Sequence, residues 1–153
     1  MAKVIWSFEA HVAAPADAVY AWMTDFREDD HARPAFVRAS GGKAGVQSTR
    51  RILARAGDSV QLEDRWGRQS FRTTARLARG QREVRIEGAY GYRATWCAAP
   101  NGRGTRVTAT TELDPRGFFA LLLPLVAGKM RAQAEHDFRG HIADLEAELG
   151  APR

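Results

Sequence analysis

The chain begins with alternating apolar and polar residues and then changes to a helical period. Between Val4 and Val12 every second residue is apolar, which predicts a half-buried β-strand. Pro15 and Asp17 suit the first turn of a following helix, because proline loses no hydrogen bond there and an acidic side chain favours the positive end of the helix dipole. The apolar face of this helix has residues three or four apart, namely Val19, Trp22, Met23 and Phe26.

Strand-length segments separated by turn residues fill the middle of the chain. A polar stretch that ends at Pro34 predicts a loop, and a short strand is expected at Phe36. The strands predicted after it are 47–55, 59–66, 70–78, 83–88, 89–99 and 105–113. Asn101-Gly102 is the strongest turn signal, since this pair accepts positive φ angles. Short turns between consecutive strands predict an antiparallel meander.

A long helical pattern runs from Phe118 to Leu149, with interruptions predicted at Pro124 and Gly128. Its apolar stripe consists of Met130, Ala134, Phe138, Ile142, Leu145 and Leu149. An antiparallel sheet with one apolar face must be covered, and this helix is the only element large enough to cover it. A strongly curved sheet around one helix tends to leave space between them, which predicts a ligand pocket.

Composition supports a single globular domain, which we place at residues 1–150. The 153 residues are 44% hydrophobic and 27% charged, as in ordinary soluble domains. One cysteine, Cys97, excludes an intrachain disulfide and a multi-cysteine metal site. No secretory signal is recognisable, and the most apolar stretch, 118–127, is shorter than the roughly 20 residues that span a bilayer. We therefore expect a cytoplasmic protein without an integral membrane segment.

The net charge of +5 is unevenly distributed and raises the question of nucleic acid. Between Arg50 and Arg106 there are 13 arginines and five acidic residues. These arginines are spread singly along predicted strands, which favours a solvated sheet face, and we expect no nucleic-acid partner. The alternative is a partner-binding or RNA-associated module that uses the outward arginines Arg51, Arg65, Arg72, Arg76 and Arg85.

The first helix carries a resemblance to a known superfamily. Ala14-Pro15, followed by Val19-Tyr20-Ala21-Trp22-Met23-Thr24-Asp25-Phe26, resembles the opening of START-like (SRPBCC) proteins, which include Bet v 1-like proteins, polyketide cyclases and lipid-transfer proteins. The resemblance implies an α+β helix-grip fold, a curved antiparallel sheet of six to seven strands wrapped around a long C-terminal helix. It also implies a hydrophobic cavity that binds lipids, isoprenoids, polyketides or similar molecules, with catalysis in a minority of members.

Asp64 is the leading candidate for chemistry. In the predicted strand 59–66 it shares a face with Leu62 and Trp66, and the aliphatic neighbours identify that face as the core. An inward carboxylate is costly unless it is paired or protonated. Arg50, on the inward face of the preceding strand, is a possible partner. Asp64 is therefore either an acid or base at the cavity wall or one half of a structural salt bridge.

Two tyrosines, Tyr90 and Tyr92, flank Gly91 and share a face if the segment is a regular strand. They either orient a ligand through their hydroxyl groups or fill the core. With Asp64 they are the candidate catalytic residues of a polyketide cyclase or dehydratase, which needs a positioned acid or base. This enzyme is the alternative to simple binding of a hydrophobic or aromatic ligand.

The expected ligand is held mainly by apolar walls. Together with Arg50, the expected ligand-binding residues are Trp22, Phe26, Phe36, Leu62, Trp66, Trp96, Phe118, Leu122, Met130 and Phe138. Asp29, Asp30 and His31 are consecutive and His136 and His141 lie five apart, so neither group predicts a metal site. We expect no metal and no cofactor, a small hydrophobic molecule as partner, and a monomer or a homodimer.

Overall fold

A computed structural model describes residues 3–26, 28, 48–66 and 68–149 of the chain. The predicted short strand at Phe36 and the loop that ends at Pro34 lie outside these residues.

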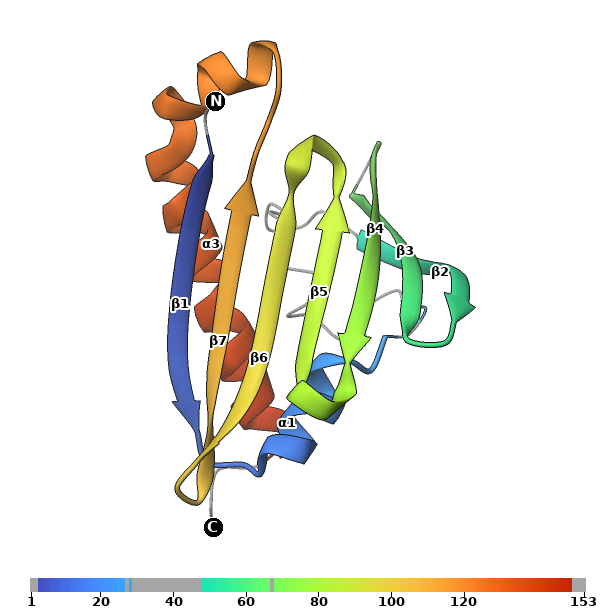
Figure 1. Ribbon diagram of the computed structural model, residues 1–153, viewed down its shortest axis with the longest axis vertical. Coiled ribbons are helices and arrows are strands. Elements are labelled where there is room, and N and C mark those ends of the chain that lie inside the picture. The colour runs from blue at the N-terminus through green and yellow to red at the C-terminus, as the bar shows by residue number, and fades with distance from the viewer. Residues whose placement is uncertain (1–2, 27, 29–47, 67, 150–153) are drawn as a thin grey trace.

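The strands of the described residues form one antiparallel sheet. They are β1 (Val4–Val12), β2 (Ser48–Ala56), β3 (Ser59–Trp66), β4 (Gln69–Ala78), β5 (Glu83–Gly88), β6 (Arg93–Asn101) and β7 (Gly104–Leu113). Their order in space is β1-β7-β6-β5-β4-β3-β2. Strands β2 to β7 therefore make the predicted meander, and β1 joins it at the β7 edge (Figure 1).

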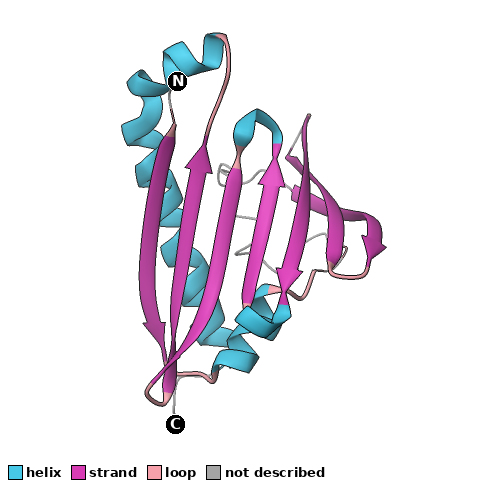
Figure 2. Cartoon of the chain, in the orientation of Figure 1, coloured by secondary structure: helices cyan, strands magenta, loops and turns pink. Residues whose placement is uncertain are grey.

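Two α-helices lie on the same side of this sheet. The long helix α3 (Phe118–Leu149) crosses behind the sheet, and α1 (Ala16–Met23) lies near its C-terminal end (Figures 1 and 2). Helix α1 ends where the Thr24 hydroxyl donates a hydrogen bond to the Tyr20 carbonyl oxygen at 2.8 Å. The seven strands and the long helix confirm the expected α+β helix-grip fold.

The predicted strand 89–99 starts later than expected, because its first residues form a 3₁₀ turn, η2 (Ala89–Gly91), and β6 starts at Arg93. The turn after 83–88 therefore lies at Gly91, one of the two glycines, Gly88 and Gly91, that the sequence offers for it. Gly91 has φ +69°, so the chain turns between the two tyrosines and they do not share the face of a strand. The interruptions predicted in the long helix are also absent, because α3 continues through Pro124 and Gly128. Both residues are exposed, so water can satisfy the backbone carbonyl freed by the proline.

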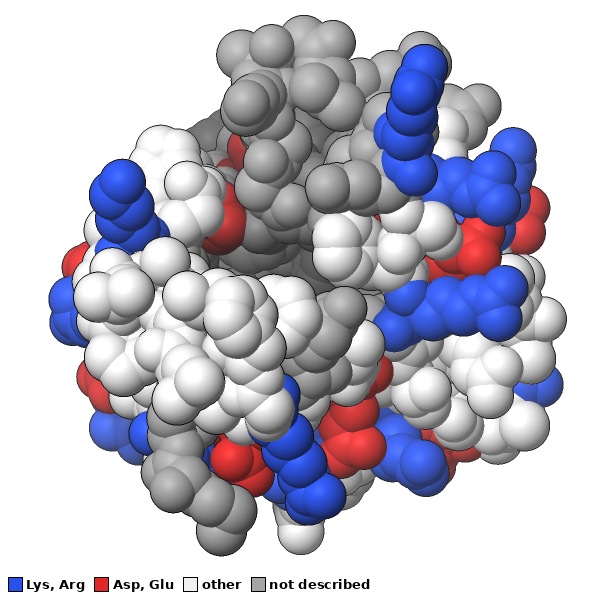
Figure 3. Space-filling view, turned by 90° about the horizontal axis from the view of Figure 1, so that it is seen from above, with Lys and Arg blue, Asp and Glu red and all other residues white. Residues whose placement is uncertain are grey.

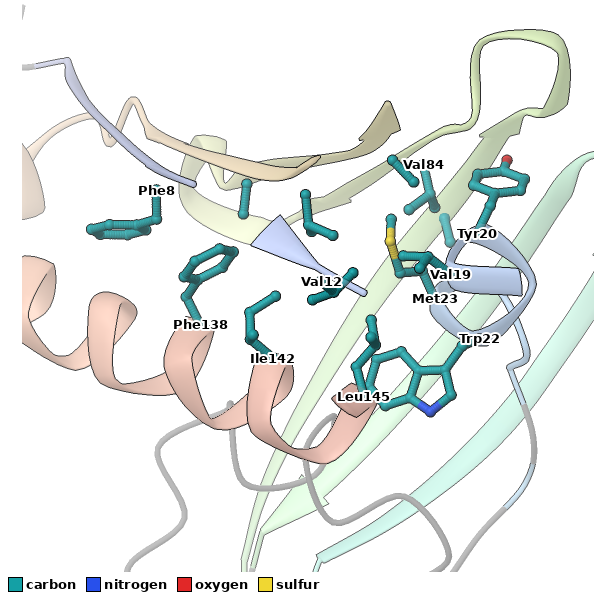
Figure 4. Close-up of a cluster of buried hydrophobic side chains, with 14 of the residues drawn as sticks. Phe8, Val12, Val19, Tyr20, Trp22, Met23, Val84, Phe138, Ile142 and Leu145 are labelled. Atoms are coloured by element: carbon teal, nitrogen blue, oxygen red, sulfur yellow. The ribbon is translucent and has the colours of Figure 1, made fainter. Parts of the chain in front are cut away.

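The core lies between the sheet and the two helices (Figure 4). Phe8 of β1 stacks on Phe138 of α3 with ring centroids 5.8 Å apart. Trp22 of α1 is buried beside Leu145, and its Nε1 donates a hydrogen bond of 2.6 Å to Glu148 Oε2 of α3. These contacts hold α3 firmly at β1 and α1.

Gly91 is required where η2 passes the end of β7. Besides its positive φ, a Cβ at this position would overlap the backbone carbonyl of Asp114. Neither backbone can move without shifting the turn that carries Tyr92.

We predict that Gly91→Ala destabilises the protein more than Gly57→Ala. Gly57 has a similar φ of +58°, but a Cβ there meets nothing within 4 Å. The Gly57 variant should lose about 1 kcal/mol from the left-handed conformation alone, and the Gly91 variant about 2 kcal/mol more because of the overlap. Urea unfolding measures both, and equal losses would contradict the role assigned to Asp114.

Candidate functional site

A charged pair lies on the inward face of the sheet, at its β2–β3 end. Arg50 of β2 is directly opposite Asp64 of β3 in the ladder. Its Nε and Nη2 donate hydrogen bonds of 2.7 and 2.8 Å to the two carboxylate oxygens of Asp64. Arg50 is buried, and its guanidinium carbon lies 6.0 Å from the centre of the Phe26 ring. The pairing predicted from strand alternation is therefore confirmed, whereas an acid or base role for Asp64 stays a prediction.

The inward stripe of α3 carries two titratable residues that the sequence analysis did not select. Asp137 and His141 lie one turn apart and flank the buried ring of Phe138. The edge of the His141 ring meets Trp96 of β6 with centroids 5.2 Å apart, and Trp96 also contacts Phe138 at 5.5 Å. Asp137 accepts a hydrogen bond of 2.8 Å from Gln133.

The ring of Tyr92 lies next to Gly88, whose missing side chain leaves room for it on the concave face of the sheet. A Cβ on Gly88 would lie 3.5 Å from Cδ1 of Tyr92 and 3.3 Å from Cγ2 of Thr73. Burial raises the pKa of the Tyr92 hydroxyl, and the Asp137 carboxylate raises it further. Burial also raises the pKa of Asp137, against smaller lowering effects of Gln133 and His136. Tyr92 and Asp137 therefore bring two proton-carrying groups to the same region from opposite sides.

His141 is neutral in the folded protein. Burial and, to a smaller extent, the positive charge of Arg50 lower the pKa of its imidazole from 6.5 to about 4. The influence of Arg50 links the charged pair on β2 and β3 to the α3 residues across the interior. The inward polar set of this site is thus Arg50, Asp64, Tyr92, Asp137 and His141.

The remaining predicted site residues are distributed unevenly. Leu62, Phe26 and Phe138 are buried, and Trp96 is half-buried against Phe138. Trp22 belongs to the contact between α1 and α3. Leu122 is half-buried, whereas Phe118 and Met130 are exposed. Phe36 and the side chains of Trp66 and Tyr90 lie outside the described part, and the ligand-binding roles of the whole set stay predictions.

Helix α3 covers the sheet unequally. Among the described elements its backbone closely approaches β1 and α1, while it approaches β2 to β6 far less. Viewed from the end at which α3 begins, the surface of the molecule is hollowed, and acidic side chains lie at the edge of the hollow (Figure 3). The inward polar set comes from elements on both sides of this interior.

The outer sheet face combines basic and acidic residues. Glu63 accepts hydrogen bonds of 3.1 Å from both Arg65 and Arg72. Its pKa is lowered, first by the hydrogen bond from Arg72 and then by the nearby Arg65, against an opposing effect of burial. Arg85 also lies 3.7 Å from Glu83. Carboxylates therefore offset part of the positive charge, which agrees with the expectation of a solvated face; the absence of a nucleic-acid partner stays a prediction.

In the part of the chain that the structure describes, no group of three or more His, Cys, Asp or Glu residues could hold a metal ion. None of the helices in that part is both long and apolar enough to cross a bilayer.

A protein-family model matches almost the whole chain. It is described as "Polyketide cyclase / dehydrase and lipid transport" and matches residues 4–150. Among curated proteins, none matches the chain significantly.

Several solved structures share the fold. The Zhui aromatase/cyclase from Streptomyces sp. R1128 has a TM-score of 0.69 at 12% identity, with 98% of each chain covered. The protein TTHA0849 from Thermus thermophilus has a TM-score of 0.68 at 21% identity, covering 96% of this chain and 100% of that one. Norcoclaurine synthase from Thalictrum flavum, in complex with dopamine and hydroxybenzaldehyde, has a TM-score of 0.63 at 16% identity, covering 99% and 90%. At these identities the likeness concerns the fold alone.

We predict that Asp64→Asn destabilises the protein by about 3–5 kcal/mol, because it leaves the buried Arg50 without its carboxylate. The matched control is Asp58→Asn, which removes an exposed pair with Arg79 of similar length, 2.8 Å. Solvent screens that pair, so the control should change stability little. Thermal and urea unfolding compare the two variants, and a small loss in both would show that the inward pair is not held by burial.

We predict that stability falls as the pH falls from about 6.5 to about 4 because of His141. The unfolded chain takes up a proton on this residue below about pH 6.5, whereas the folded protein resists it until about pH 4, so protonation favours unfolding by up to about 3 kcal/mol. His141→Leu should remove this part of the pH dependence. His136→Gln, on an exposed position of the same helix, should keep it, and identical urea-unfolding profiles for both variants would refute the assignment.

Proposed function

The chain belongs to the polyketide cyclase / dehydrase and lipid transport family, and we propose that it binds a small hydrophobic or aromatic molecule between its sheet and α3. The observation that supports this proposal is the unequal cover of the sheet: among the described elements α3 lies closest to β1 and α1, and the surface is hollowed at the end where α3 begins. A folded interior otherwise packs to near-crystal density, so such a space is suited to a guest.

The side chains around this interior suit a mostly apolar guest. The inward faces of β3, β4 and β5 carry small and aliphatic residues that belong to the buried core, including Leu62, Ala75 and Val84. The half-buried Trp96 adds aromatic surface beside Phe138. Burying about 300 Å² of apolar ligand surface would contribute roughly 7 kcal/mol before the cost of association. The apolar walls therefore supply affinity without orienting the ligand.

Orientation comes from the inward polar set. The Arg50–Asp64 pair lies on the sheet, while Asp137 and His141 lie on α3, so a ligand between them meets polar groups on both sides. Tyr92 adds a hydroxyl group that stays protonated at neutral pH. Ligands with hydroxyl or carbonyl groups on an aromatic or polyketide-like skeleton fit this combination better than pure hydrocarbons.

The second candidate function is a cyclase or dehydratase that uses the same interior. Both oxygens of Asp64 accept hydrogen bonds from Arg50, which favours a structural role for that pair. The pKa of Asp137 is raised, and the Asp137 carboxylate raises the pKa of Tyr92. These two residues are therefore better suited than the Arg50–Asp64 pair to move a proton to or from a substrate. Asp137 would take the proton next to a carbonyl group, and Tyr92 would donate to the developing oxyanion.

We predict that the purified protein binds 1-anilinonaphthalene-8-sulfonate with a rise in fluorescence and carries or accepts apolar molecules in native mass spectrometry. Trp96→Ala should weaken dye binding about tenfold, because it removes aromatic surface that faces the interior. Thr95→Ala is the matched control, since Thr95 is the neighbouring residue of β6 with its side chain on the opposite face of the sheet.

A dye affinity that neither variant changes would contradict binding in this interior. Incubation with a linear poly-β-ketone then separates the two functions. Aldol cyclisation gives an isomer of equal mass that chromatography resolves, and dehydration gives a product that has lost water, whereas a binding protein returns the unchanged substrate. Product formation that Asp137→Asn abolishes, with dye binding retained, would establish the enzyme.

A further inference from the structure

The first half of α3 exposes large apolar side chains. Phe118, Leu121 and Leu125 are 70%, 75% and 80% exposed and recur at a helical spacing of three and four residues. The full set, which we call the apolar patch, is Phe118, Phe119, Leu121, Leu125, Val126 and Met130. A contiguous apolar surface of this kind marks an interaction site on a soluble protein.

The charged residues on the part of α3 that carries the apolar patch are basic. Residues 115–134 contain no aspartate or glutamate, but they contain Arg116, Lys129 and Arg131, all exposed. Arg131 also lies 3.7 Å from Glu135, one turn further along α3. Apolar side chains bordered by basic residues are complementary to a surface that is apolar inside and anionic outside.

The position of the patch favours a flat partner. The first turns of α3 project beyond the ends of the neighbouring strands, at one extremity of the molecule (Figure 1). This is also the end of the molecule that Figure 3 shows, where the surface is hollowed. A projecting helix end can reach a flat surface without interference from the sheet.

We propose that the apolar patch docks this protein on the surface of an anionic lipid bilayer. Phe118, Leu121 and Leu125 enter the boundary between headgroups and acyl chains, and Arg116 and Lys129 contact the lipid phosphates. The helix lies at the interface and does not span it. This docking is independent of the ligand proposed above, although it brings the hollow end of the molecule to a source of apolar molecules.

A second copy of the chain suits the patch less well. In a two-fold symmetric contact the same surface meets itself, so Arg116, Lys129 and Arg131 of one copy would face those of the other. Residues 115–134 contain no carboxylate, and the nearest one along α3 is Glu135 beside Arg131. Anionic lipid provides more opposite charge at this place than a second copy does.

Vesicle flotation of the full chain tests the proposal, with phosphatidylcholine vesicles that either lack or contain about 30% phosphatidylglycerol. The protein should float with the anionic vesicles, and Leu121→Asp/Leu125→Asp should reduce the bound fraction at least tenfold. The control is Ile5→Asp/Leu53→Asp, which adds two charges at exposed apolar positions on β1 and β2 and should leave flotation unchanged. Circular dichroism confirms that both variants are folded.

The basic residues have their own test. Arg116→Gln and Lys129→Gln should each weaken binding to anionic vesicles roughly fivefold, and added salt should weaken wild-type binding. Absence of wild-type flotation, or equal flotation of the Leu121→Asp/Leu125→Asp variant, overturns the proposal. Sedimentation velocity tests the alternative of a second copy. If the wild type forms a concentration-dependent dimer that the Leu121→Asp/Leu125→Asp variant loses, and the wild type does not bind vesicles, the lipid proposal is overturned in favour of a second copy.

Discussion

The position of one helix against the sheet determines most of what this protein can do. Phe138 of α3 meets Phe8 on β1 and Trp96 on β6, and Trp22 of α1 reaches Glu148 near the helix end. These contacts fix α3 at one edge of a sheet that curves away from it. Among the described elements, α3 lies close to β1 and farther from β2 to β5. The proposed function depends on a space for a ligand between the two layers.

That geometry also explains the unusual placement of charges. Arg50 and Asp64 satisfy each other on the inner face, where an isolated charge would be expensive. His141 faces the same interior from α3 and stays neutral, since burial and the charge of Arg50 both oppose protonation. Burial also raises the pKa of Asp137, because it disfavours the charged carboxylate. An interior that holds several partly desolvated polar groups is well suited to orient a ligand or move a proton.

The two ends of α3 serve different purposes. Its second half provides Phe138, His141, Ile142 and Leu145 to the core, whereas its first half directs Leu121 and its neighbours to solvent. The same helix therefore closes the interior at one end and presents an apolar, positively bordered surface at the other. Since the two halves differ in burial, substitutions in the first half can change surface interactions without disturbing the fold.

The sequence by itself determined the fold, and the tertiary structure decided the site. Period-two and helical patterns are local properties, so strands such as 59–66 and 83–88 and the long helix could be read from them directly. The same patterns placed Arg50 and Asp64 on one inward face, and the ladder pairs them. Alternation was wrong at Tyr90 and Tyr92, because a turn at Gly91 with φ +69° replaces the strand there. The importance of Asp137 and His141 was invisible in the sequence, because it arises from burial against Trp96 and from the charge of Arg50, which approach them only when α3 lies across the sheet.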